Sequence, residues 1–166
     1  YAFYGSLQDW MISNSALRWE LLIRYISYLF IHLSFLHTLI ATVMFLALGK
    51  MVCEFYNGLL FFLLIIASSM CGAFFYGLIL DDQFPLIGLF PAIYGLIGAY
   101  TYISWTSLRS VGARGANAFT LVAVLLGIQI IFKMLFNGNN DWLADLFGFL
   151  AGFLFAFIID RYFSRY

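Results

Sequence analysis

Charged side chains are scarce in this chain of 166 residues: Asp, Glu, Lys and Arg together make up 10% of it. Apolar residues make up 64%, and the mean hydropathy is +0.97. Ordinary soluble domains carry about 25% charged residues, so this composition excludes that class. Acidic and basic side chains balance at eight each, which gives no indication of a nucleic-acid surface or a polybasic lipid anchor. The composition indicates a protein embedded in a lipid bilayer.

Cysteine and histidine are also rare. Cys53 and Cys71 lack the C-x-x-C spacing that a zinc or redox site needs, so we expect small side chains buried in the interior. His32 and His37 are five positions apart, which would put them on different faces of a helix rather than in the i, i+4 pair of a helical metal site. We therefore predict neither a metal nor a cofactor.

Five apolar segments of about 20 residues are long enough to cross the hydrocarbon core as helices. Strands of a β-barrel would be about half as long and would alternate in polarity, so the sequence predicts an all-α membrane bundle. Residues 1–23, rich in aromatic and polar groups, are typical of an interfacial segment, and residues 24–166 form the predicted transmembrane domain. The predicted helices span residues 31–52, 58–80, 91–108, 117–136 and 142–160.

Basic residues set the predicted orientation. One side of the predicted helices carries Lys50, Arg109, Arg114, Arg161 and Arg165. The other side carries Arg18, Arg24 and Lys133, together with the acidic residues Asp9, Glu20, Asp81, Asp82 and Asp141. By the positive-inside rule, the first side and the C-terminus are predicted to be cytoplasmic.

Small residues punctuate the segment from Gly88 to Tyr100, which reads GLFPAIYGLIGAY. In lipid, helices are held together by close backbone approach at such residues, because lipid tails compete with any merely apolar contact. The 91–108 helix is therefore predicted to be the centre of the bundle. The last predicted helix carries a G-x-x-x-G pair of the same kind. We expect helix packing at Gly88, Gly95, Gly98, Gly148 and Gly152.

Asp145 stands about one turn inside the last predicted helix. A carboxylate there is costly unless it faces a polar cavity or finds a partner, which makes it a candidate for a functional site. The alternative is that Asp145 serves the helix start, where a negative side chain meets the positive end of the helix dipole. Because an unpaired buried acid costs several kcal/mol, we expect Asp145 to lie within hydrogen-bonding reach of His37 or Tyr94.

As a set, these residues resemble the motifs of the rhomboid intramembrane proteases, from about Arg24 to the end of the chain. In that family a helix entrance reads H-x-x-x-x-H-x-x-x-N, a later helix opens with G-x-S-G and a tyrosine four residues after the serine, and the last helix reads A-H-x-x-G-x-x-x-G. The first pattern is similar to His32, His37 and Ala41, the second to Gly88, Phe90, Pro91 and Tyr94, and the third to Ala144, Asp145, Gly148 and Gly152.

The resemblance implies the rhomboid scaffold without its chemistry. Phe90 stands where the family has its nucleophilic serine, Asp145 where it has the histidine base, and Ala41 where it has the oxyanion asparagine. Pro91 has no N–H to offer an oxyanion. Serine attack needs a hydroxyl, a base and oxyanion donors together, so we expect no catalytic residue and no peptidase activity.

A role in binding is what the resemblance then implies. The chain would recognise transmembrane segments of other membrane proteins in the bilayer without cutting them, and this role would also suit an accessory subunit of a membrane complex. His37, Tyr94 and Asp145 would remain as a residual polar cluster. Rhomboids of the common form have six spanning helices, so the resemblance also implies a further helix before Tyr1. We expect a multi-pass protein of a bacterial inner membrane.

Two other functions stay open at this point. An intramembrane serine endopeptidase with another nucleophile would use Ser34, Ser68 or Ser69, with His37 as base. Serine in membrane helices more often serves packing, and none of the three follows a G-x-S-x-G turn. A small transporter would need charged residues along a path, whereas Asp145 and Lys133 stand near helix ends, and no internal repeat is visible.

Overall fold

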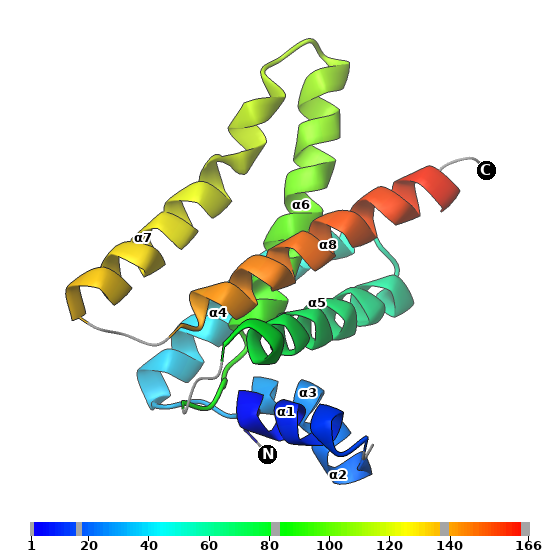
Figure 1. The fold of residues 1–166 in the computed structure, drawn as a ribbon. Helices are drawn as coiled ribbons and strands as arrows, with labels where there is room; N and C mark the ends of the chain where they lie inside the picture. The colour runs from blue at the N-terminus through cyan, green and yellow to red at the C-terminus, as the bar shows by residue number, and fades with distance from the viewer. Residues whose placement is uncertain (1, 16–17, 81–83, 137–139, 164–166) are drawn as a thin grey trace.

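The computed structural model describes residues 2–15, 18–80, 84–136 and 140–163. Its helices are α1 (Gly5–Ser13), α2 (Trp19–Leu22), α3 (Arg24–Ser27), α4 (Phe35–Cys53), α5 (Gly58–Ile79), α6 (Phe90–Ser110), α7 (Thr120–Phe136) and α8 (Trp142–Phe163), with 3-10 turns η1 (Tyr28–Phe30) and η2 (Gly115–Phe119). The short helices α1 to α3 lie together below the long helices α4 to α8 (Figure 1). Across the described residues, the predicted all-α membrane bundle is confirmed.

Three of the long helices are apolar and long enough to cross a membrane by length and composition alone: Phe35–Cys53, Gly58–Ile79 and Trp142–Tyr162. α6 has 21 residues, but tyrosine, threonine and serine lower its hydropathy, and α7 has 17. A helix enclosed by its neighbours does not need a fully apolar surface, which suits α6. Asp81, Asp82 and Arg165, used above for orientation, lie outside the described residues, as does the side chain of Lys133.

The first long helix starts later than the sequence predicts. α4 begins at Phe35, because Ser34 is its N-cap and accepts a hydrogen bond from the backbone N–H of His37 at 3.2 Å. Residues 31–34 are not helical. At the other end of α4, Cys53 is exposed, and Cys71 in α5 is partly exposed. The prediction that both cysteines are buried is therefore wrong. A thiol on a lipid-facing surface needs no burial in protein.

α6 is the centre of the bundle, as predicted, and all residues from 91 to 99 are buried. Its contact with α8 is very close. A Cβ atom added at Gly152 would meet the backbone of Gly95, and one added at Gly148 would meet the backbone of Pro91. Close contact of this kind is how membrane helices gain packing energy in lipid.

The remaining two predicted packing glycines have different roles. Gly98 belongs to the same α6–α8 crossing, since an added Cβ would meet the backbone of Phe149. Gly88 precedes α6 and has a φ of +102°, a conformation that favours glycine. An added Cβ at Gly88 would lie 3.0 Å from Cε1 of His37. Gly88 therefore forms a turn beside a histidine ring rather than a helix-packing surface.

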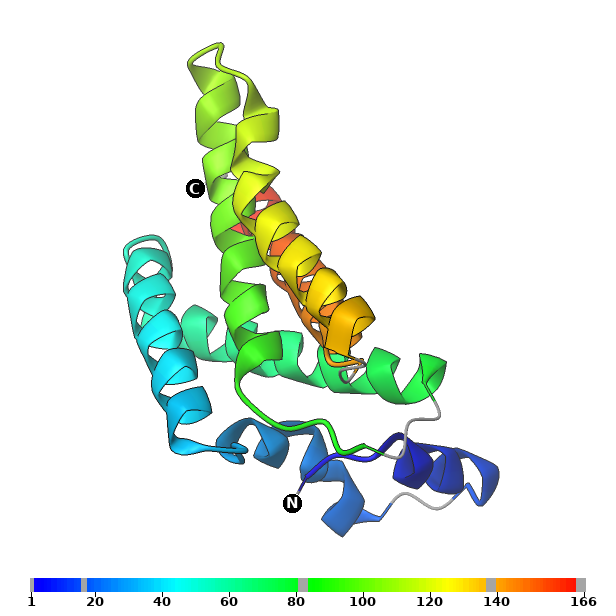
Figure 2. The ribbon, with the colours of Figure 1, turned by 90° about the vertical axis from the view of Figure 1, so that its left-hand side faces the viewer.

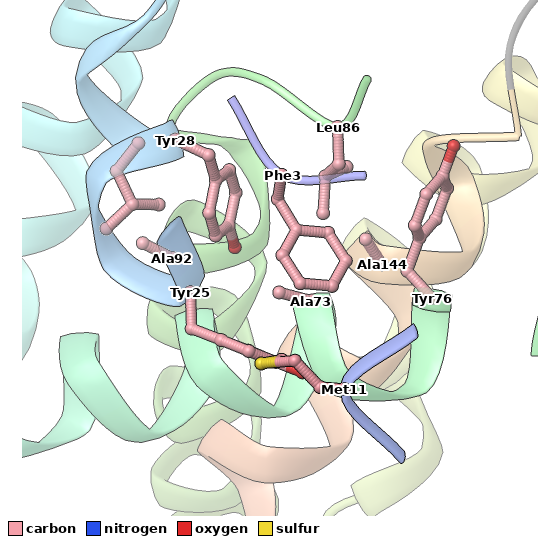
Figure 3. Close-up of a cluster of buried hydrophobic side chains, with 10 residues drawn as sticks. Phe3, Met11, Tyr25, Tyr28, Ala73, Tyr76, Leu86, Ala92 and Ala144 are labelled. Carbon is pink, nitrogen blue, oxygen red and sulfur yellow. The ribbon is translucent and has the colours of Figure 1, made fainter. Parts of the chain in front are cut away.

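The N-terminal segment is tied to the bundle by specific polar contacts. The backbones of Phe3 and Leu86 exchange two hydrogen bonds, of 3.2 Å and 2.8 Å. Gln8 is buried, accepts a hydrogen bond from the Tyr25 hydroxyl at 2.8 Å, and donates one to the carbonyl of Phe74 in α5 at 3.1 Å. Figure 3 shows the apolar cluster around these contacts, which includes Phe3, Met11, Tyr25, Tyr28, Ala73, Tyr76, Leu86, Ala92 and Ala144.

Tyr28 connects this apolar cluster to the two central helices. Its side chain is fully buried, and its hydroxyl donates to the carbonyl of Ser69 in α5 at 2.9 Å. Its own carbonyl accepts from the N–H of Gly88 at 3.0 Å, just before α6 begins. The N-terminal segment therefore positions the loop that leads into α6.

α7 is mostly exposed over residues 120–131, the part of the helix whose side chains are described. Figure 1 shows α7 leaving the top of α6 and diverging from it, and the turned view in Figure 2 shows the same hairpin from the side. In the part of α7 whose side chains are described, residues 120–131, Val122 alone is buried. Several of its other large apolar side chains are exposed, namely Leu121, Val124, Ile128, Ile130 and Ile131. Within residues 120–131, the apolar packing of α7 is limited to Val122 and to the partly buried Leu125 and Leu126.

Candidate functional site

The candidate site lies where the starts of three helices come together. Phe90 is the first residue of α6, Asp145 lies in the first turn of α8, and His37 lies in the first turn of α4. The closeness of Gly148 to Pro91 brings the start of α8 against the start of α6. The glycine contacts described above therefore determine which side chains meet at the site.

Phe90 lies directly against His37. Their rings stack with centroids 5.2 Å apart and an interplanar angle of 27°. Phe90 also packs on a buried apolar cluster that contains Ala41, Tyr94 and Phe149. The position that resembles the serine of the proteases is thus occupied by an aromatic ring in contact with the neighbouring histidine, and it offers no hydroxyl.

The two histidines are neighbours, which differs from the prediction. The rings of His32 and His37 meet edge to face with centroids 5.4 Å apart. The prediction of different faces is wrong because it assumed that both lie on one helix, whereas His32 lies in the non-helical stretch before α4. Nε2 of His32 and Nδ1 of His37 are buried without a hydrogen-bond partner among the described atoms.

Metal-ligating side chains are dispersed in this fold. In the ranges that the structure describes, no three or more His, Cys, Asp or Glu side chains gather closely enough to hold an ion. His32 and His37 are a neighbouring pair with suitable chemistry, and the ring of Phe90 stacks on that of His37. The pair alone would supply two of the four protein ligands that a structural zinc site needs.

Asp145 has a partner, but a different one from those predicted. Its side chain is 1% exposed, and Oδ2 accepts a hydrogen bond from Nε2 of Gln129 in α7 at 2.7 Å. Among the described hydrogen bonds, none joins Asp145 to His37 or Tyr94. The reason is geometric: His37 faces the ring of Phe90, whereas the long amide side chain of Gln129 reaches Asp145 from α7. The carboxyl group also lies in the first turn of α8, where the helix dipole favours negative charge.

Two acceptor atoms of this pair lack a partner. Oδ1 of Asp145 and Oε1 of Gln129 are both buried, and neither has a hydrogen-bond partner among the described atoms. A carboxylate can accept about four hydrogen bonds, so a single one leaves Asp145 far from satisfied. Tyr94, the third predicted member of the polar cluster, is 2% exposed and lies in the apolar cluster with Ala41.

The candidate alternative nucleophiles have structural contacts of their own. The hydroxyl of Ser34 caps α4, and that of Ser69 donates to the carbonyl of Ile65 at 2.6 Å. Ser68 is fully buried against Gly95. In the described part of the chain, none of the three hydroxyls is hydrogen-bonded to the imidazole of His37, so no serine–histidine pair is formed.

Gln129 was not among the predicted site residues. Its signal was an amide within the apolar run LVAVLLGIQII, where a polar side chain needs a partner on another helix. The sequence could not pair it with Asp145, because hydropathy does not show which faces of α7 and α8 meet.

One comparison with known proteins identifies a family. A family model for the Rhomboid domain matches residues 20–162, which include every residue of the site. No curated protein and no solved structure gave a significant match. Together with the three apolar helices that are long enough to span, the match makes this an integral membrane protein. Since the matched region covers most of the sequence, the chain belongs to the rhomboid family.

Proposed function

We propose that the chain is a catalytically inactive rhomboid that binds transmembrane segments of other membrane proteins. The observation that carries the proposal is the stack of Phe90 on His37, with ring centroids 5.2 Å apart. The ring occupies the position that resembles the nucleophilic serine of the proteases and presents only C–H groups. A serine-type acyl transfer cannot begin without a hydroxyl or another nucleophile.

The other parts of a serine-peptidase site are also replaced. At the position of the base stands Asp145, whose carboxyl group is engaged by the amide of Gln129. At the position of the oxyanion asparagine stands Ala41, a fully buried side chain with no donor. Pro91 removes a backbone N–H from the same region. Of the parts that the resemblance implies, only His37, similar to the family's other oxyanion-region residue, is kept. Because nucleophile, base and oxyanion donors act as a unit, replacing the others leaves little catalysis.

The features that support binding are the intact scaffold and the loosely enclosed α7. The close crossing of α6 and α8 at Gly95, Gly148 and Gly152 keeps the centre of the bundle rigid. α7 borders the site and presents mostly exposed apolar side chains. A transmembrane segment that displaced α7 would meet the start of α6 and α8. Such a binder also suits the role of a subunit in a membrane complex.

The basic residues support a bacterial inner-membrane orientation with the C-terminus in the cytoplasm. Lys50, Arg109 and Arg161 lie in the last turns of α4, α6 and α8, and Arg114 lies in the loop after α6. Fusing a reporter that is active only in the cytoplasm to the C-terminus tests this orientation. An active reporter is expected, and activity of a periplasmic reporter at the same position would contradict it.

Binding and cleavage can be tested on one sample. The full chain, reconstituted in liposomes with a panel of fluorescent single-span peptides, is expected to bind a subset of them, measured by energy transfer. Mass spectrometry of the same sample is expected to recover every peptide intact. An unrelated helical membrane protein in the same lipid gives the background of random encounter. A peptide cut at a defined bond, or a signal at background for the whole panel, would contradict the proposal.

A further inference from the structure

We propose that Asp145 is a specificity-determining residue for bound transmembrane segments: it binds a side-chain amide, from Asn or Gln, that takes the place of Gln129. This inference rests on the proposed function, because it concerns which segments the same site accepts. It is carried by a buried carboxyl group that accepts one hydrogen bond, from a helix whose described side chains are mostly exposed.

The Asp145–Gln129 pair is short of hydrogen bonds. Asp145 is 1% exposed and accepts one hydrogen bond, at 2.7 Å, while its Oδ1 and the Oε1 of Gln129 have no partner among the described atoms. Buried acceptors without donors are costly. A segment that brought a donor to this place would therefore gain more than a segment that brought only apolar contact.

The pair also closes the approach to the site. Both unpartnered oxygens are inaccessible, so nothing reaches Asp145 unless α7 moves away and the hydrogen bond from Gln129 breaks. Within residues 120–131 of α7, Val122 is the one buried side chain, and Leu125 and Leu126 are partly buried against the apolar cluster that contains Ala41 and Tyr94. The broken hydrogen bond is the polar part of the local cost of admitting another helix.

The hydrogen-bonding chemistry of Asp145 favours a transmembrane segment that carries an amide in place of Gln129. An apolar segment would leave Asp145 buried without any donor, whereas an amide restores the lost bond and can also serve Oδ1. An amide both donates and accepts, so it suits the carboxyl group in either protonation state. Lysine or arginine would add the cost of carrying a charge into the membrane. Gln129 already shows that an amide on a membrane helix fits Asp145.

The test compares two peptides that differ at one position. Both are single-span helices with a leucine–alanine core, and one carries Asn where the other carries Leu, placed in turn at each depth of the outer half of the span. With the wild-type full chain in liposomes, we expect the Asn peptide to bind about 3- to 15-fold more tightly at its best depth, as for interhelical hydrogen bonds in membranes.

Substitutions at Asp145 and Gln129 test whether the difference in affinity between the two peptides depends on this pair. Asp145→Leu should reduce the ratio of the two affinities to about one, whereas Asp145→Asn, which keeps an acceptor, should retain part of it. Gln129→Met removes the hydrogen bond that any entering segment must break, so it should tighten binding of both peptides by a similar factor and leave the ratio of their affinities in place. Ile128→Met, at an exposed neighbouring position of α7, serves as the matched control and should behave like the wild type.

The outcomes separate this inference from the proposed function. Equal binding of both peptides by the wild type would overturn the inference and leave the proposed function standing. Failure of every peptide to bind would overturn both. An unchanged ratio in a folded Asp145→Leu or Asp145→Asn protein, together with no gain in Gln129→Met, would place the selectivity elsewhere and overturn the inference.

Discussion

The ring of Phe90 lies on the ring of His37 at a centroid separation of 5.2 Å, with 27° between the ring planes. The contact joins the first turn of α4 to the first residue of α6, and Gly88 closes it from the side, since an added Cβ there would lie 3.0 Å from the histidine. The site is therefore packed as a small aromatic core. A serine protease needs this same space for a hydroxyl and a substrate carbonyl.

Restoring a serine at position 90 alone should not restore serine-peptidase activity. Phe90→Ser supplies a hydroxyl, but Asp145 remains held by Gln129 and Ala41 donates no hydrogen bond, so labelling by a fluorophosphonate probe is expected to stay at background. The combination of Phe90→Ser, Pro91→Gly, Asp145→His and Ala41→Asn rebuilds the family's set and serves as the comparison. Strong labelling of Phe90→Ser by itself would show that a base survives in the wild-type site.

The α6–α8 crossing should tolerate no side chain at its closest point. Gly152→Ala places a Cβ against the backbone of Gly95, and overpacking of this kind typically costs about 1–3 kcal/mol. We expect a lower midpoint in thermal or denaturant unfolding in detergent. Gly127→Ala is the matched control, because no atom lies within 4 Å of an added Cβ there. It should be neutral or slightly stabilising. Equal effects of the two substitutions would contradict the crossing.

Gln8 should be more important for stability than its position near the start of the chain suggests. Gln8→Leu removes the hydrogen bonds to Tyr25 and to the carbonyl of Phe74 and leaves the buried Tyr25 hydroxyl without this acceptor, at a cost of about 1–3 kcal/mol. Faster hydrogen exchange throughout α1 and α3 is expected. Asp9→Asn, at an exposed neighbouring position, is the control and should leave exchange unchanged.

Tyr25 should make the free energy of unfolding depend on pH. Burial raises the pKa of its hydroxyl from 10.0 to about 12. The folded state therefore keeps the phenol proton to a higher pH than the unfolded state. The stability that this contributes is complete below pH 10 and is lost as the pH rises toward 12. The free energy of unfolding should fall by about 1 kcal/mol more in the wild type than in Tyr25→Phe between pH 9 and pH 11. Parallel pH profiles of the two proteins would contradict this.

Much of the helical architecture follows from the sequence because runs of about 20 apolar residues have few alternatives in a bilayer. The glycines of the α6–α8 crossing could likewise be predicted, since small residues are what close helix contacts require. The contact of His32 with His37 could not, because it depends on Ser34 delaying the start of α4. A helix start is set by its cap as well as by hydropathy.

The partner of Asp145 was mispredicted for a related reason. Its depth in the last helix and its need for a donor were both readable from the sequence, but which neighbour supplies the donor depends on how α7 is rotated about its own axis. The docking of the N-terminal segment through the backbone pairing of Phe3 with Leu86 also depends on the tertiary structure. Backbone pairing between segments so far apart leaves no local pattern in the sequence.

The most direct test of the account is to incubate the reconstituted wild-type protein with a transmembrane segment that it binds and to determine the masses of both by mass spectrometry. The proposed inactivity predicts an intact segment and an unmodified chain, with binding retained throughout. A segment cut at one defined bond, together with an acyl group mapped to a single residue of this chain, would contradict it.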